Sequence, residues 1–154
     1  MIKSLLLLFC CAALPALAQD TLAIITNPGT GQDNLTLPEL QKVFRAEKAK
    51  AEDGKKFVVV MLGAGKPERE CLLREVLKMS EADFTKYYLQ ATFTGLVAAA
   101  PKSLDSAAAM KAFVAATPGA IGYIRAADVD ATVKVVKIDG AAPTDAGYKL
   151  NCGK

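Results

Sequence analysis

Residues 56–77, KFVVVMLGAGKPERECLLREVL, decide the fold of this chain. The unbroken apolar run at 57–62 is rich in Val, and it predicts a central strand that is covered on both faces of an α/β sheet. Gly63 and Gly65 then permit a tight backbone turn. Pro67 suits the first turn of a helix, and the apolar residues that follow at helical spacing give this helix one buried face.

The turn between this strand and this helix is the candidate ligand site, because ligands of open α/β sheets gather at such turns. A helix N-terminus with free N–H groups attracts an anion. Arg69 has the two-pronged geometry that grips an oxyanion. The remaining donors are expected from the turn itself, namely from Gly63, Ala64, Gly65 and Lys66.

Two alternatives stand beside this hypothesis. Glu68 and Glu70 occupy the first turn of the same helix, where they can satisfy the helix end themselves and repel an anion. Tyr123, within a later apolar strand, can either line the ligand cleft or pack in the core. The sequence leaves both questions open.

The first eighteen residues have the organisation of a secretory signal peptide. Lys3 supplies a basic start, residues 5–14 are apolar, and residues 16–18 form a small-x-small cleavage site. This apolar run is too short to span a bilayer. We therefore expect a secreted mature chain that begins near Gln19.

The four cysteines fall into two pairs. Cys10 and Cys11 lie in the leader and raise the alternative of a lipoprotein, but Phe9 and Cys10 stand where lipoprotein processing needs a small residue. Cleavage leaves Cys71 and Cys152, which in an oxidising compartment are expected to form a disulfide between the helix start and the C-terminal tail. The alternative is a buried thiol at Cys71 and a free thiol in the tail.

Composition argues against several classes of function. The chain has no histidine, which removes Ser-His and Cys-His nucleophile pairs and histidine metal sites. We therefore expect no enzyme, no metal and no cofactor. Loss of Lys3 with the leader lowers the formal charge from +3 to +2, which is too small and too evenly spread to indicate a nucleic-acid partner.

Hydrophobic periodicity predicts alternating strands and helices along residues 19–154, without a linker that would split them. Thr36 with Glu39, and Ser80 with Asp83, form capping boxes that start two of the helices. The expected strands are 21–26, 57–62, 120–125 and 132–138, and the expected helices begin at 36, 67, 80 and 105 or 106. This order predicts one α/β domain of two or three layers, with a small mixed sheet flanked by about four helices.

Three segments together resemble the phosphate-binding-protein-like, type II periplasmic solute-binding proteins. They are residues 35–45 (LTLPELQKVFR), residues 65–80 and residues 117–123 (TPGAIGY), the last being close to a signature of that family. The resemblance implies the fold of a single lobe of such a protein. Two features of the family are missing: the Ser-Gly-Thr that donates to phosphate, where residues 62–66 read LGAGK, and the tryptophan before Asp53.

The resemblance implies a periplasmic module that binds phosphate or a similar small oxyanion in uptake or sensing linked to an ABC transporter. The expected partner is a membrane transporter or sensor protein, and a second subunit or another protein is a candidate to close the site. The alternative is an adaptor for such a membrane protein that binds no small ligand. The sequence does not decide the ligand or the oligomeric state.

Overall fold

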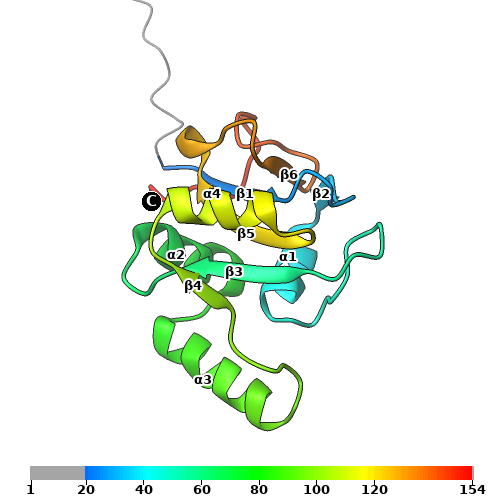
Figure 1. Cartoon of the computed structure of the whole chain (residues 1–154). Helices are drawn as coiled ribbons and strands as arrows, with labels where there is room; N and C mark the ends of the chain where they lie inside the picture. Colours follow the sequence, from blue (N-terminus) through cyan, green and yellow to red (C-terminus); the bar gives the residue numbers. More distant parts are fainter. Residues whose placement is uncertain (1–19, 154) are drawn as a thin grey trace, which may run out of the picture.

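The computed structural model describes residues 20–153, so the predicted signal peptide lies outside the described residues. A six-stranded sheet and four α-helices make up the fold (Figure 1). The strands are β1 (Leu22–Thr26), β2 (Asn34–Leu35), β3 (Val58–Leu62), β4 (Lys102–Leu104), β5 (Ala120–Arg125) and β6 (Lys134–Ile138). The helices are α1 (Leu37–Phe44), α2 (Pro67–Leu72), α3 (Glu81–Phe93) and α4 (Ala107–Ala116), with a π-helical turn at Leu73–Leu77 and a 3₁₀ turn at Ala126–Asp128.

The sheet is mixed, as predicted, with the strand order β2-β6-β1-β5-β3-β4. β3 runs parallel to β5 on one side and to β4 on the other. β1 lies antiparallel to β5 and β6, and β2 pairs with β6 in parallel. The two strands at the centre of the order are therefore β1 and β5.

The placement of β3 corrects the sequence prediction in part. β3 has a neighbouring strand on each side, but it lies next to the edge strand β4 rather than at the centre of the sheet. Its second half, Val60 to Leu62, pairs with β4 and is buried, whereas Val58 lies beyond the reach of β4 and is 37% exposed. β4 is not among the strands that the sequence predicted, since Lys-Ser-Leu has no strand pattern of its own.

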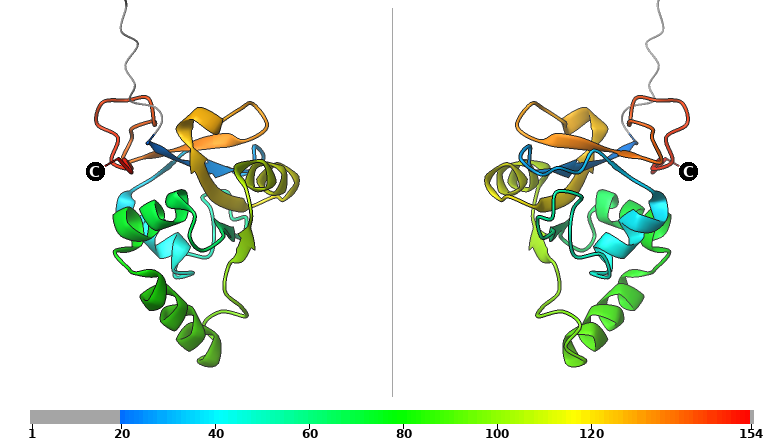
Figure 2. Two further views of the ribbon diagram at one scale, coloured as in Figure 1. Left: turned by 90° about the vertical axis from the view of Figure 1, so that its left-hand side faces the viewer. Right: turned by 90° about the vertical axis from the view of Figure 1, so that its right-hand side faces the viewer.

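Helices cover both faces of the sheet, which gives three layers. Figure 2 shows α4 on one side of the sheet and α1 and α2 on the other. Gly122 and Tyr123 are neighbours in β5 and face opposite layers, because side chains alternate between the two faces along a strand. A Cβ at Gly122 would lie 2.5 Å from Sδ of Met110 in α4, so this glycine lets α4 approach closely. The ring of Tyr123 faces the opposite layer and contacts Phe44 of α1, with 6.0 Å between ring centroids.

Both predicted capping boxes are confirmed. Thr36 Oγ1 accepts a hydrogen bond from Glu39 N at 3.3 Å, and Glu39 Oε2 accepts one from Thr36 N at 3.0 Å. Ser80 and Asp83 make the same reciprocal pair at the start of α3. These bonds satisfy N–H groups that a helix start leaves without a partner.

The helix after Pro67 is less regular than predicted. It is α-helical only to Leu72, and it continues as the π-helical turn to Leu77. Lys78, in the left-handed conformation with φ of 54°, ends it. α3 then leads away from the sheet, and only its Phe84, Tyr88 and Ala91 are buried (Figure 2).

The C-terminal tail packs against the rest of the fold. The disulfide between Cys71 and Cys152 is present and joins the tail to α2. Tyr148 is 4% exposed, and its Oη donates to the Leu22 carbonyl at 2.8 Å. Leu150 is buried as well, and its carbonyl accepts a hydrogen bond from Leu22 N at 2.9 Å. The tail thus covers the start of β1.

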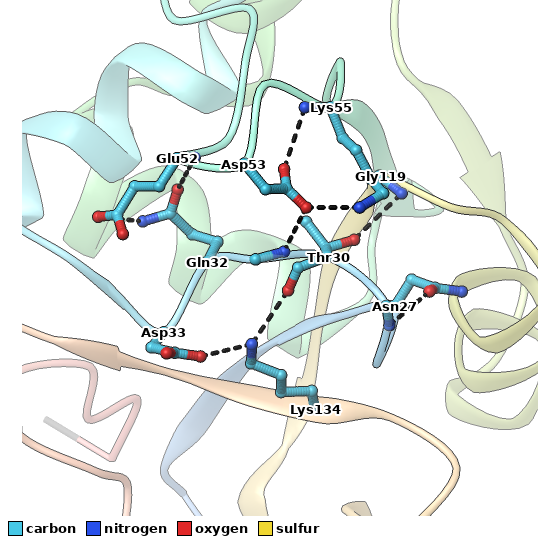
Figure 3. Close-up of polar contacts among 11 residues, drawn as sticks. Asn27, Thr30, Gln32, Asp33, Glu52, Asp53, Lys55, Gly119 and Lys134 are labelled. Atoms are coloured by element: carbon cyan, nitrogen blue, oxygen red, sulfur yellow. Dashed lines mark hydrogen bonds and ion pairs between the residues drawn. The ribbon is translucent and has the colours of Figure 1, made fainter.

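Polar contacts tie three loops together at the end of the sheet where β3 begins (Figure 3). Asp53 Oδ2 accepts a hydrogen bond from Gly31 N at 2.6 Å, and Thr30 Oγ1 accepts one from Gly119 N at 3.1 Å. Gly119 has φ of 82°, and a Cβ there would lie 2.2 Å from the Lys56 carbonyl oxygen. This network fixes the entry into β5 at the end of the sheet opposite the candidate ligand turn.

Within residues 20–153, each helix is too short, or too polar, to cross a membrane.

Candidate functional site

A cleft of about 270 Å³ opens at the carboxyl end of β3. The parallel pairing of β3 with β4 and with β5 brings the carboxyl ends of all three strands to the same side. The starts of α2 and α4 follow β3 and β4 there. The residues that line the cleft are Leu62, Lys66, Pro67, Glu68, Asp105, Ser106, Ala107, Ile124 and Arg125.

The predicted ligand turn lies beside this cleft, but Lys66 alone of its four residues lines the cleft, whereas Gly63, Ala64 and Gly65 do not. Half of the N–H groups of the turn are free. Gly63 N donates to the Leu104 carbonyl at 2.9 Å, and Lys66 N donates to the Gly63 carbonyl at 3.3 Å. Among residues 20–153, the N–H groups of Ala64 and Gly65 have no acceptor. Gly65 has φ of 83°, which is a conformation that favours glycine. The turn therefore keeps two backbone donors for a ligand.

The start of α4 also lines the cleft. Ser106 is the N-cap, and its Oγ accepts a hydrogen bond from Ala109 N at 3.1 Å. The N–H groups of Ala107 and Ala108 find no acceptor in the described part of the chain. Because α4 is ten residues long, its macrodipole places partial positive charge at this end. The carboxylate of Asp105 beside it offsets part of that charge.

Two cationic and two anionic side chains line the cleft. Lys66 has no ion-pair partner among residues 20–153. Arg125 Nε lies 2.6 Å from Glu68 Oε1, and the Arg125 side chain is 46% exposed. The terminal guanidinium nitrogens of Arg125 make no hydrogen bond to the described residues. Lys66 is thus the cation that is free for a ligand, while Arg125 is shared with Glu68.

Arg69 is placed differently from the sequence prediction. Its side chain is 7% exposed, and it donates to both carboxylate oxygens of Glu81, at 2.8 and 2.5 Å. Its Nη1 donates to the Leu62 carbonyl at 2.9 Å, and the guanidinium lies 5.0 Å from the centroid of the Phe84 ring. Arg69 therefore ties β3, α2 and α3 together, and the cleft is lined without it.

Tyr123 is also away from the cleft. It is fully buried, and its Oη accepts a hydrogen bond from Leu62 N at 3.0 Å. Burial raises the pKa of the Tyr123 hydroxyl well above its usual value. Of the two roles that the sequence left open, the structure shows core packing, with the hydroxyl holding the last residue of β3.

Sequence reasoning missed three residues of the cleft, namely Asp105, Ser106 and Arg125. Ser106 was expected as a helix cap, but its nearness to the ligand turn depends on the pairing of β4 with β3. Arg125 ends its strand on the same side only because β5 is parallel to β3. Both facts are properties of the topology, which local sequence patterns do not carry.

Solved structures with the same fold come from phosphate transport. An ABC-type phosphate transport receptor from Vibrio cholerae matches with a TM-score of 0.66 and 23% identity over 83% of this chain and 50% of its own. A putative phosphate ABC transporter substrate-binding protein from Clostridium perfringens, solved with bound phosphate, matches with a TM-score of 0.68, also at 23% identity, over 83% and 49%. PstS from Borrelia burgdorferi matches with a TM-score of 0.65 and 15% identity over 85% and 54%.

The chain shares the fold of these phosphate-transport receptors. It spans about half the length of each receptor. Neither a protein-family model nor a curated protein sequence matches it. The receptor fold confirms the resemblance drawn from the sequence at the level of architecture.

Proposed function

We propose that the cleft at the end of β3 binds a small oxyanion, phosphate or one like it, in periplasmic solute uptake or sensing. The observation that carries the proposal is a set of unpaired donors in and beside one cleft: Lys66 and the start of α4 line it, and the turn next to it carries the free N–H groups of Ala64 and Gly65. A receptor of the same fold from Clostridium perfringens holds phosphate, which supports this ligand class.

The chemistry of the cleft favours weak binding. The free backbone donors and Lys66 can contact an anion without breaking another hydrogen bond or ion pair, whereas Arg125 has to be shared with Glu68. The carboxylates of Glu68 and Asp105 oppose a dianion. In an open cleft each charge contact is worth about 1 kcal/mol in water at 4 Å. Because Lys66 is the one cation in the cleft without an ion-pair partner among the described residues, we expect a Kd of about 1 mM or weaker, and closure by a membrane transporter or another subunit would tighten it.

Calorimetric titration with phosphate, compared with sulfate, tests the proposal. We expect saturable heat with the unchanged chain and at least a fivefold weaker interaction for Lys66→Ala. Lys42→Ala is the matched control, since Lys42 is an exposed lysine of α1 far from the cleft. Absence of heat and of any thermal shift at millimolar phosphate, or equal binding by Lys66→Ala, would overturn the proposal.

An adaptor that binds a membrane sensor or transporter, and no small ligand, is the second candidate. The two carboxylates in the cleft, Glu68 and Asp105, favour it because they repel an anion. The two functions separate when envelope extracts are passed over immobilised protein. If capture of a transporter or sensor is the same with the unchanged chain and with Lys66→Ala, and neither responds to phosphate, the adaptor function is supported.

A further inference from the structure

The far end of α3 presents apolar side chains to solvent. Leu89 is 71% exposed, Phe93 is 93% exposed and Leu96, just after the helix, is 57% exposed. Leu89 and Phe93 are four residues apart, which places them on one side of the helix, and Leu96 follows Gly95, whose φ of 76° ends the helix. We call these three residues the α3 tip. Figures 1 and 2 show this end of α3 at the extremity of the molecule, away from the sheet.

The α3 tip lies within a stretch that carries no charge. Residues 87–101, YYLQATFTGLVAAAP, contain no Asp, Glu, Lys or Arg, although 35 of the 154 residues of the chain are charged. Exposed surfaces of soluble monomers are normally interspersed with charges, and contiguous apolar patches usually mark a contact. The combination therefore points to a surface that is covered by a partner.

A groove runs beside the α3 tip. It has a volume of about 340 Å³ and lies between α3 and the segment that leads into β4. The apolar part of the groove is lined by Phe84, Tyr88 and Leu89 of α3 and, on the other side, by Ala100 and Pro101, and it can receive an aromatic side chain. The remaining lining residues are Thr85, Thr92, Ser103 and Arg69, whose charge is paired with Glu81. Phe93 points away from the core of its own chain, since it is almost fully exposed.

We propose that the α3 tip is the interface between two copies of this chain, with Phe93 of each copy seated in the α3 groove of the other. A twofold interface sets the same surface against itself, so a charged patch would repel its partner copy and an uncharged one does not. This inference is independent of anion binding, because the cleft lies at the carboxyl end of β3 and shares no lining residue with the groove.

The size of the patch indicates a reversible dimer. An aromatic side chain buries roughly 150–250 Å², so Phe93 alone supplies about a quarter of the roughly 800 Å² per partner of a standard interface, and Leu89, Leu96 and the groove add to it. A lipid surface is less well matched, because only Lys86 and Lys102 flank the uncharged stretch. Lys102 Nζ already lies 5.0 Å from the centroid of the Phe113 ring.

Analytical ultracentrifugation of the mature chain from low micromolar to millimolar concentration tests the proposal. We expect a monomer–dimer equilibrium. Phe93→Glu should weaken the dimer affinity at least tenfold, because both copies in a twofold dimer carry the substitution. Phe93→Leu should largely retain the dimer. Ala112→Glu, which adds the same charge to an exposed position of α4, is the matched control and should behave as the unchanged chain.

Three results would overturn the proposal. They are a chain that stays monomeric throughout, a dimer that persists in Phe93→Glu, and a dimer that Ala112→Glu also removes. A parallel sedimentation with vesicles of anionic phospholipid covers the other occupant. A monomeric chain that binds these vesicles through Phe93 would replace the second copy by a lipid surface. Because Phe93 is exposed, its substitution should leave the fold intact, and circular dichroism checks this.

Discussion

Arg69 and Glu81 show how burial changes the meaning of a charged residue. In the sequence, Arg69 lies in the first turn of a helix, where its guanidinium is expected to bind an anion. In the structure, its guanidinium is buried against Phe84 and is neutralised by Glu81, whose side chain is 41% exposed. A sequence carries no direct sign of which long side chain folds inward, so this part of the site could not be predicted.

Arg69 is buried and its partner Glu81 is partly exposed, so removing the two members of the pair should cost unequal amounts of stability. Glu81→Ala leaves the Arg69 cation buried without its carboxylate, and we expect a loss of about 3 kcal/mol in the free energy of unfolding. Arg69→Met removes the buried charge and keeps most of the apolar stem, so its loss should be smaller, about 1–2 kcal/mol. Urea unfolding measures both, and a larger loss for Arg69→Met would contradict this account.

At the scale of the element, the helix starts were the most predictable features. Both capping boxes follow from two polar residues at a fixed spacing, and each has the reciprocal bonds that this spacing predicts. The short strand β4 and the π-helical turn were not predicted. β4 exists because β3 offers it a partner, and the Leu73–Leu77 turn follows packing against α1 rather than any local signal.

The capping box of α1 should make stability depend on pH. Hydrogen bonds from the Lys48 ammonium and from Thr36 lower the pKa of Glu39 to about 2. Because the folded-state pKa is below the usual 4.5, the carboxylate stabilises the fold above about pH 4.5, and this contribution is lost as the pH falls toward 2. Since Glu39 is partly exposed, we expect a contribution of about 1 kcal/mol.

Glu39→Gln provides the measurement. The variant should be less stable than the unchanged chain at pH 7 by about 1 kcal/mol, with the difference vanishing near pH 2. Glu70→Gln is the control, because Glu70 is exposed and its side chain makes no hydrogen bond to the described residues. A difference for Glu39→Gln that stays constant between pH 7 and pH 2 would show that its carboxylate charge plays no part.

At the scale of the whole molecule, the disulfide spans much of the chain. Cys71 and Cys152 are separated by 81 positions, and a loop of this size restricts the unfolded chain strongly, which stabilises the folded state by about 2–5 kcal/mol. We expect reductant to lower the urea midpoint accordingly. Cys71→Ser/Cys152→Ser should show the lowered midpoint with and without reductant. An unchanged midpoint of the reduced chain would mean that tail packing by Tyr148 and Leu150 suffices.

The overall architecture followed from the sequence, whereas the composition of the cleft did not, and the ligand turn stays a prediction. Alternating strands and helices, together with TPGAIGY at 117–123, indicated the receptor fold that the structure shows. The cleft, however, lies at the ends of three strands, and the end of β3 is 40 or more residues away in the sequence from the ends of β4 and β5. Which chain segments meet there depends on strand order, and no local pattern encodes it.

The strand order has one more consequence, for behaviour in concentrated solution. The outermost strands, β2 and β4, contain only two and three residues. Edge strands this short offer few unpaired backbone groups with which another chain could pair, and short edges are a known protection against fibril growth. The molecule can therefore expose an apolar helix end while its sheet edges give little opportunity for open-ended polymerisation through backbone hydrogen bonds.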